Sequence, residues 1–198
     1  MPSKRKFQPV TTDEPSCLLM IKSSDDPQSQ SDEAFNPCSF TVRVPNTDFV
    51  TSVSKIVPLY FSCNNRFNEI PGQEEVDTVF VAFSGLLGGN MLTGLEGKGR
   101  IYEVLCCAHR QNQSKTYLRE NPPLEPGDPA QLGVVIQYEP VVFENKNGIH
   151  AWDLDYRTPR DMSTMNVRLL DSSMKELKLP RDVNVTIVMK IFHSGYAR

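Results

Sequence analysis

The sequence predicts an all-β fold, namely a two-sheet antiparallel sandwich built as a single jelly roll of about eight strands with long loops. Eight or nine short runs rich in β-branched and aromatic residues recur along the 198-residue chain. No segment has the apolar spacing of an amphipathic helix of ten or more residues. Because the connections between runs are long and unequal, a Greek-key sandwich is favoured over a meander, and the jelly roll is its eight-strand member.

The composition is typical of a soluble globular protein, with 39% hydrophobic and 23% charged residues. A formal net charge of -3 argues against extensive wrapping of nucleic acid, because nucleic-acid binders usually carry a basic excess. No run approaches the roughly 20 apolar residues of a membrane helix. The first residues also lack the apolar segment of a secretory signal. We therefore expect an intracellular product without a membrane span.

Taken in chain order, residues 1–16 are expected to form a flexible basic N-terminal arm, because they hold three prolines and little apolar surface. Residues 17–198 are expected to form the single jelly-roll domain, with polar loops at 22–37 and 109–132. Pro58 indicates an edge strand or a bulge within its run. Strands are predicted at 17–21, 39–44, 53–63, 77–84, 100–108, 133–143, 148–156, 165–171 and 182–192.

The final run, "VNVTIVMKIF", defines two faces. One alternating set is wholly apolar and is assigned to the core between the sheets: Val183, Val185, Ile187, Met189 and Ile191. The opposite set begins with polar residues and becomes partly apolar at Val188 and Phe192. An apolar outer face indicates cover by another subunit. Val188 and Phe192 are therefore predicted assembly contacts.

The arm supplies three further predicted assembly contacts, Lys4, Arg5 and Lys6. This cationic cluster suits an acidic partner, membrane headgroups or nucleic acid, and three cations give only modest, salt-sensitive affinity. A solvated tail explains the same cluster equally well. Any contact with nucleic acid is expected only through this arm.

The stretch "WDLDYR" holds two carboxylates, Asp153 and Asp155, in alternating positions. In a strand their Cα atoms lie roughly 6–7 Å apart, a separation that invites comparison with a glycosidase pair. The same alternation places Trp152, Leu154 and Tyr156 on the other face, as in a half-buried strand. We favour the two-faced strand over the active site.

The glycine-rich stretch around Gly97 and Lys98 does not fit a phosphate-binding loop. Leu92 stands where that loop needs glycine, and Gly99 stands where it needs a hydroxyl. There is also no Gly-x-Ser-x-Gly motif around a serine nucleophile. The sequence therefore predicts no nucleotide cofactor, no small-molecule substrate and no enzymatic activity.

The five cysteines are expected to be reduced and mostly buried, because their number is odd and no signal peptide is present. Cys107 and His109 would share one face of a strand while Cys106 points to the other. A zinc site needs four suitable ligands brought together. No metal site is therefore predicted.

Two parts of the chain resemble the penton-type capsid proteins of polintons, adintoviruses, virophages and related large DNA viruses. The first part is "LLMIKSSDD" followed by "CSFTVRVPNTDFVTSVSKIVPLYFSCNNRFNEI". In those proteins a strand with a short Ser/Asp motif leads to a "SxFTVxL" strand. A "V-x-x-I-x-L" strand then ends in an asparagine-aromatic-asparagine-Ile turn, matched here by Asn64, Asn65, Phe67, Asn68 and Ile70.

The second part is the closing hairpin "MNVRLLDSSMKELKLPRDVNVTIVMKIF", which resembles the final two strands of the same proteins. Members of that family often have a glycine in the turn, where this chain has "SSMKEL". The resemblance covers about half the chain, and residues 72–147 do not align with it.

The resemblance implies a structural virion protein with a single jelly-roll fold. It implies the pentameric vertex (penton) subunit of an icosahedral capsid, assembled inside the host cell. Its partners would be further copies of itself, in a homopentamer, and a major capsid protein of the double-jelly-roll type. One alternative is a minor or cement capsid protein on the same fold. Another is a glycan- or receptor-binding β-sandwich, for which Tyr60 and Tyr117 are the only candidate aromatic contacts.

Overall fold

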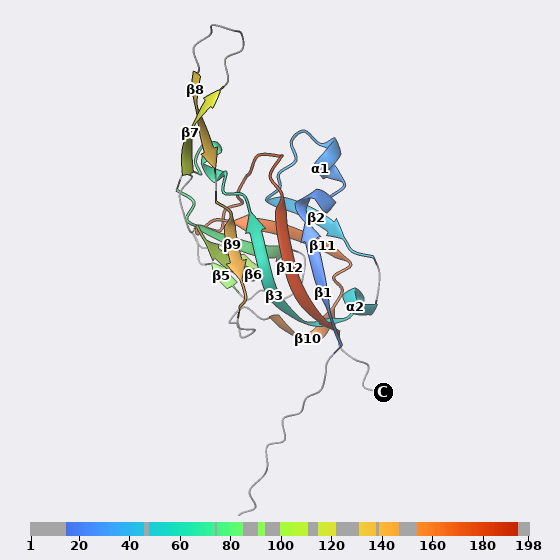
Figure 1. Cartoon of the computed structure of the whole chain (residues 1–198). Helices are drawn as coiled ribbons and strands as arrows, with labels where there is room; N and C mark the ends of the chain where they lie inside the picture. The colour runs from blue at the N-terminus through green and yellow to red at the C-terminus, as the bar shows by residue number, and fades with distance from the viewer. Residues whose placement is uncertain are drawn as a thin grey trace, which may run out of the picture.

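Strands make up most of the regular secondary structure in the described part of the chain. The computed structural model describes residues 15–45, 48–73, 75–84, 91–93, 100–110, 115–121, 131–137, 139–146 and 154–193. These residues form two five-stranded sheets and one two-stranded ribbon (Figure 1). The longest helices within these ranges have four residues, as the lack of amphipathic helical spacing predicts.

The first sheet has the strand order β1-β12-β3-β10, and a fifth strand, β9, also pairs with β3. The long strand β3 is flanked on one side by β12 and on the other by β10 at its start and β9 at its end. The strands are β1 (Ser16–Lys22), β3 (Val53–Cys63), β9 (Val141–Glu144), β10 (Leu154–Arg160) and β12 (Val185–His193).

The second sheet has the order β2-β11-β4-β6-β5, and every pairing in it is antiparallel. Its inner face packs against the inner face of the first sheet around one large cluster of buried side chains. Its strands are β2 (Ser39–Arg43), β4 (Thr78–Ser84), β5 (Met91–Thr93), β6 (Arg100–His109) and β11 (Thr164–Leu170).

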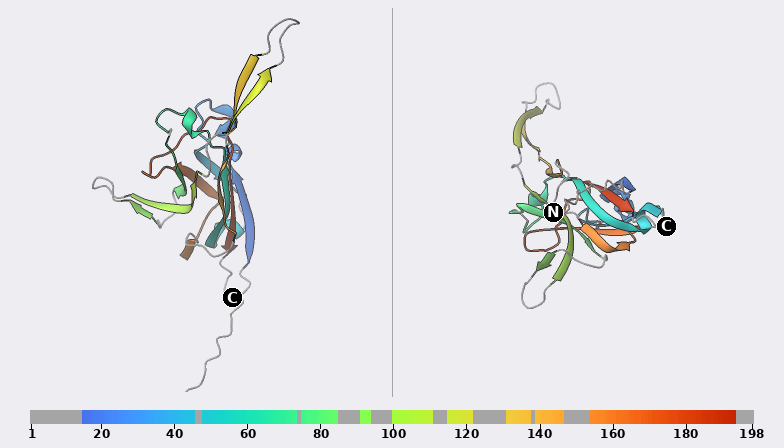
Figure 2. Two further views of the ribbon diagram at one scale, coloured as in Figure 1. Left: turned by 60° about the vertical axis from the view of Figure 1, so that its left-hand side comes forward. Right: turned by 90° about the horizontal axis from the view of Figure 1, so that it is seen from below.

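The strand pairing is that of a jelly roll. β1 pairs with β12, β2 with β11, β3 with β10, and β4 with β6. These four pairs are the successive rungs of one long antiparallel hairpin that is rolled up. The first and third pairs lie in the first sheet, and the second and fourth pairs lie in the second sheet (Figures 1 and 2). The predicted fold class, an all-β two-sheet sandwich of the jelly-roll type, is confirmed.

The register predicted for the last strand is confirmed. Ile187, Met189 and Ile191 have no exposed surface, whereas Val188 and Phe192 between them are partly exposed. The alternation follows from the pleat of the strand, which sends successive side chains to opposite faces of the sheet. A shift of one residue would exchange the core set with the outer set.

Pro58 lies beside a bulge in β3. The register between β12 and β3 shifts between Val188, which pairs with Tyr60, and Met189, which pairs with Pro58. Leu59 is therefore the extra residue, and its carbonyl accepts a hydrogen bond from the backbone of Asn145 at 2.8 Å. Of the two alternatives for Pro58, the bulge is correct and the edge strand is wrong, because β3 has neighbours on both sides.

The prediction of a long loop at 109–132 is wrong in part. β7 (Lys115–Asn121) lies within it and pairs with β8 (Gln131–Gln137) in a ribbon that projects from one end of the sandwich (Figure 2). The single strand predicted at 133–143 is instead two strands, β8 and β9. Pro140 lies between them and cannot donate a backbone hydrogen bond, so it interrupts the run.

Further boundaries differ from the prediction, and the last strand, expected at 182–192, is found as β12 at Val185–His193. The strand expected at 148–156 is found as β10 at Leu154–Arg160, and residues 147–153 lie outside the described part. The loop expected at 22–37 contains the 3₁₀ turn η1 (Ser23–Asp25) and the helical turn α1 (Gln28–Ser31). Two other short turns, α2 (Asp48–Thr51) and η2 (Phe67–Glu69), flank β3.

Candidate assembly surface

The outer face of the first sheet carries the two assembly contacts that alternation predicts on β12. Val188 lies directly opposite Met20 of β1 on one side and Tyr60 of β3 on the other. Directly opposed residues share a face of the sheet, and their Cβ atoms lie about 4.5–5.5 Å apart. Leu18 opposes Lys190 on the same face. We call Leu18, Met20, Tyr60, Val188 and Phe192 the outer apolar face.

Two members of the outer apolar face are strongly exposed. Leu18 is 68% exposed and Met20 is 58% exposed, while Tyr60, Val188 and Phe192 are partly buried. Single exposed apolar residues are common on protein surfaces. Adjacent ones on neighbouring strands are different, because contiguous apolar patches mark contact sites.

Phe192 at the end of this face lies between two cations. The ammonium of Lys190 is 5.0 Å from the centre of its ring, and that of Lys55 is 5.9 Å away. Both distances fall within the range of a cation–π interaction. The Phe192 end of the outer apolar face is therefore positively charged and suits a partner with acidic or carbonyl groups.

Of the predicted assembly contacts, the structure brings Val188 and Phe192 together on this face. Lys4, Arg5 and Lys6 lie outside the described residues. Leu18 and Met20 belong to the same face, and the sequence did not single them out. Their run, "CLLMI", is apolar at every position, so its alternation reveals no outer face.

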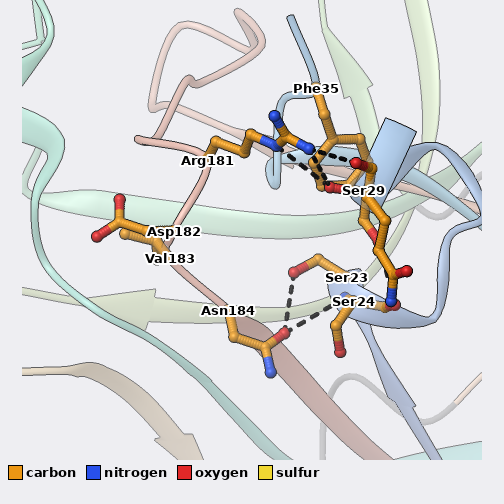
Figure 3. A pocket seen from close by; sticks show the side chains of 9 residues that line it. Ser23, Ser24, Ser29, Phe35, Arg181, Asp182, Val183 and Asn184 are labelled. Atoms are coloured by element: carbon orange, nitrogen blue, oxygen red, sulfur yellow. Dashed lines mark hydrogen bonds between the residues drawn. The ribbon is translucent and has the colours of Figure 1, made fainter. Parts of the chain in front are cut away.

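A pocket of about 220 Å³ lies at one end of the first sheet, where residues 23–35 meet residues 181–184 (Figure 3). The Ser23 hydroxyl donates to Asn184 Oδ1 at 3.0 Å and accepts from the backbone N–H of Val185, also at 3.0 Å. The Arg181 guanidinium donates to the carbonyls of Ser29 and Gln30. These bonds tie the segment after β1 to the segment before β12.

Asp26 anchors the same segment to the second sheet. It is 6% exposed, and its carboxylate accepts backbone hydrogen bonds from Gln28 at 2.8 Å and Thr41 at 2.6 Å. The Ser/Asp motif of the sequence resemblance, "SSDD", is thus a structural joint in this chain. This structural role could not be predicted from the residues alone, because polar side chains in a polar stretch carry no periodic signal.

The asparagine turn after β3 is also a structural joint. Phe67 and Asn65 are buried, and the Arg66 guanidinium bonds both carboxylate oxygens of Glu69 and reaches Asp182 of the opposite loop. The hydrogen bonds that Arg66 donates to Glu69, and then the one that it donates to Asp182, raise the pKa of its guanidinium above the ordinary value. The turn therefore holds two loops together at the same end of the sandwich.

The cysteines are free thiols, as predicted, and Cys38, Cys63 and Cys106 are buried. Burial raises the pKa of all five thiols, and that of Cys63 reaches about 12. A thiol with a raised pKa has a smaller thiolate fraction at neutral pH and is a weaker nucleophile. Cys106 faces the core while Cys107 and His109 are more exposed, which confirms the predicted alternation.

Most of the other chemical candidates of the sequence lie outside the described residues. No group of three His, Cys, Asp or Glu side chains fit to hold a metal ion occurs among the described residues. Asp153, Gly97, Lys98 and Gly99 lie outside these ranges, and the backbone of Asp155 pairs with Lys55 in the first sheet. None of the helices described is long and apolar enough to cross a membrane.

Strand order and burial define the class of this chain as a single jelly-roll sandwich with an apolar outer face on one sheet. No protein-family model and no curated protein matches the sequence. Among solved structures, the chain is similar to the selenomethionine-labelled mavirus penton protein, with a TM-score of 0.35 and 8% sequence identity. The match covers 90% of this chain and 98% of that chain. At these values the similarity carries no weight for function, and the fold assignment rests on this chain's own strand pairing.

Proposed function

We propose that this protein is a structural capsid subunit of the virion, and that five copies form the vertex of an icosahedral shell. The observation that carries the proposal is the outer apolar face on a jelly-roll sandwich. The residues that resemble penton-type capsid proteins support it, because the Ser/Asp motif and the asparagine turn hold structural positions in this fold.

A closed ring needs a heterologous contact, in which one surface of a subunit meets a different surface of its neighbour. The outer apolar face is suited to be one of those two surfaces. It combines exposed apolar side chains with a cationic end at Phe192. Specific interfaces commonly surround an apolar centre with a polar rim.

The proposal extends to further parts of the chain and to further partners. The arm is shorter than the expected residues 1–16, because Ser16 belongs to β1 and the Pro15 carbonyl accepts a hydrogen bond from the His193 N–H. Residues 1–14 serve as the basic arm, in which Lys4, Arg5 and Lys6 contact a neighbouring subunit, and the rest of the chain forms the jelly-roll domain. The assembled vertex contacts a major capsid protein of the double-jelly-roll type. The protein itself has no enzymatic activity.

Negative-stain imaging of the purified full-length protein tests this function. We expect class averages of closed rings with five-fold symmetry. A minor or cement protein on the same fold would give monomers or another symmetry, while still binding the capsid lattice. A strictly monomeric protein that joins no capsid lattice would overturn the proposal. Binding to glycans by such a monomer would instead favour the attachment role.

A further inference from the structure

The strand β1 ends the first sheet, and its backbone pattern shows which groups face the free edge. The Pro15 carbonyl accepts a hydrogen bond from the His193 N–H at 2.9 Å. In an antiparallel pair the residues that bond the partner alternate with those that do not. With the unbroken register of β1 and β12, the backbone groups of Ser16, Leu18 and Met20 point away from β12.

A second hydrogen bond supports this assignment and closes one end of the edge. Lys22 is the next residue in the alternating series, and its N–H donates to Asp25 Oδ2 at 2.9 Å instead of to β12. The 3₁₀ turn η1 follows directly. An added strand would therefore find open donors and acceptors at residues 16–20 and would meet η1 beyond them.

The edge of β1 lacks the features that protect such strands. Natural edges usually carry a charge, a proline or a bulge. Residues 16–21 have no charge or proline, and the β1–β12 register has no bulge. Within the described residues β1 pairs with β12 alone. Cys17 and Leu19 face inward, yet they are only partly buried, so the sandwich itself is open at this side.

Building on the proposed capsid role, we propose that residues 1–14 of a neighbouring copy add as a strand to the free edge of β1. The segment is long enough, because fourteen extended residues span about 46 Å, twice the roughly 23 Å of a seven-residue strand. It supplies backbone partners for Ser16, Leu18 and Met20. This is strand addition to a sheet edge, in which main-chain hydrogen bonds provide the affinity.

Charge fixes the direction of the added strand. The exposed acidic residues Asp25, Asp32 and Glu33 lie just beyond the Lys22 end of β1. The cations Lys4, Arg5 and Lys6 lie near the start of the arm, so they meet these acids only when the arm runs antiparallel to β1. Residue 7 onward then follows the strand past Met20 and Leu18. Phe7 supplies an apolar side chain that packs on the exposed residues Leu18 and Met20.

Photo-crosslinking of the full-length chain tests the inference. A photoreactive amino acid replaces Leu18, and the protein is assembled from an equal mixture of ¹⁴N- and ¹⁵N-labelled copies. We expect crosslinks from position 18 to residues 7–12, with mixed-isotope pairs in about the proportion that random mixing gives. Crosslinks found only within one isotope would show that the arm returns to its own β1 and would overturn the inference.

Two variants in the crosslinkable background sharpen the test. Met20→Pro removes an N–H that faces the free edge and spares the bonds to β12, as proline allows on an edge strand. Joint reversal of the cations (Lys4→Glu, Arg5→Glu and Lys6→Glu) removes the charge match. Each should lower the mixed-isotope yield at least tenfold at an unchanged melting temperature, whereas the exposed control Lys175→Glu should not.

The mass of the mixed sample separates this inference from the proposed function. Five-copy rings without mixed-isotope crosslinks from position 18 to the arm would overturn the inference alone. A sample that stays monomeric and gives no such crosslinks would overturn both.

Discussion

The outer faces of the two sheets differ, although their inner faces are alike. On the first sheet the outer face exposes Leu18 and Met20 beside Val188. On the second sheet the part of the corresponding face formed by β2 and β11 carries exposed polar side chains. Thr41 there donates to Asn166 at 2.8 Å, and Arg168 approaches Glu176 at 4.0 Å.

The second sheet also has apolar residues on its outer face, but the chain covers them itself. Ala82, Val104 and Leu170 are buried there, and Met174, from the turn after β11, packs against them. The first sheet has no such cover for Leu18 and Met20 among the described residues. The outer face of the second sheet is covered by the chain itself or by polar groups, and the exposed apolar residues of the first sheet support the proposal that another chain covers them.

The largest effect is expected from Ile187→Asp, which tests the inner face that both sheets share. Ile187 has no exposed surface, so the variant buries a charge without a partner. The cost of several kcal/mol is a large part of the stability of such a domain. Circular dichroism and thermal melting should show an unfolded protein. If the Ile187→Asp variant folds normally, Ile187 is not in the core and β12 is not a central strand of the sheet.

Asp26→Ala should have the next largest effect, because it breaks the joint between the two sheets. It leaves the backbone N–H groups of Gln28 and Thr41 without their acceptor. We expect a loss of about 2–3 kcal/mol in the free energy of unfolding, measured by urea titration. The exposed neighbour Asp25 accepts one bond, from Lys22, so Asp25→Ala should cost less than half as much. Equal losses would contradict the structural role of Asp26.

Val188→Asp tests the contrast between the outer faces directly. The side chain points outward, so the free energy of unfolding of the monomer should change by about 1 kcal/mol or less, while the oligomer dissociates. Thr164→Asp, on the outer face of the second sheet, is the matched control and should leave both properties unchanged. Sedimentation velocity measures the oligomer and thermal melting the fold. If the control variant dissociates the oligomer and Val188→Asp does not, the interface lies on the second sheet and the proposal is wrong.

The smallest effect concerns the turn that covers the second sheet. Met174 has φ = 58°, a left-handed conformation that costs a non-glycine residue roughly 1–2 kcal/mol. Met174→Ala keeps that strain and loses the cover over Leu170, so it should destabilise by about 1–2 kcal/mol. Met174→Gly loses the cover and relieves the strain, so its net change should be below about 1 kcal/mol. Thermal denaturation measures both variants. A lower melting temperature for Met174→Gly than for Met174→Ala would contradict this account of the turn.

Alternation in the sequence predicted those parts of the fold in which one face of a strand is polar. The run "VNVTIVMKIF" gave the register of β12 and the outward positions of Val188 and Phe192. The run "CLLMI" has no polar position, so the exposed pair Leu18 and Met20 could not be predicted from it. Their exposure arises because β1 lies at the edge of the sheet, which is a property of the topology.

Residues 22–37 and 109–132 show why the remaining predictions failed. The first segment is ordered by polar bonds between residues far apart in sequence, such as Ser23 to Asn184. The second contributes β7 to a ribbon whose pairing partner lies beyond a proline-rich stretch. Apolar content and local period report neither kind of contact, because both depend on where distant segments meet.

The central claim is that another copy of the chain covers the outer apolar face, and the oxidation of methionine tests it most directly. Met20 belongs to this face and is 58% exposed. Met174 packs on the outer face of the second sheet, and Met189 is buried in the core. The rate of sulfoxide formation at each residue would be measured by mass spectrometry, for the oligomer and for diluted monomer.

We predict that Met20 is oxidised several-fold more slowly in the oligomer than in the monomer, while the rates at Met174 and Met189 are the same in both. An equal rate at Met20 in the two states, or protection of Met174 in its place, would contradict the claim.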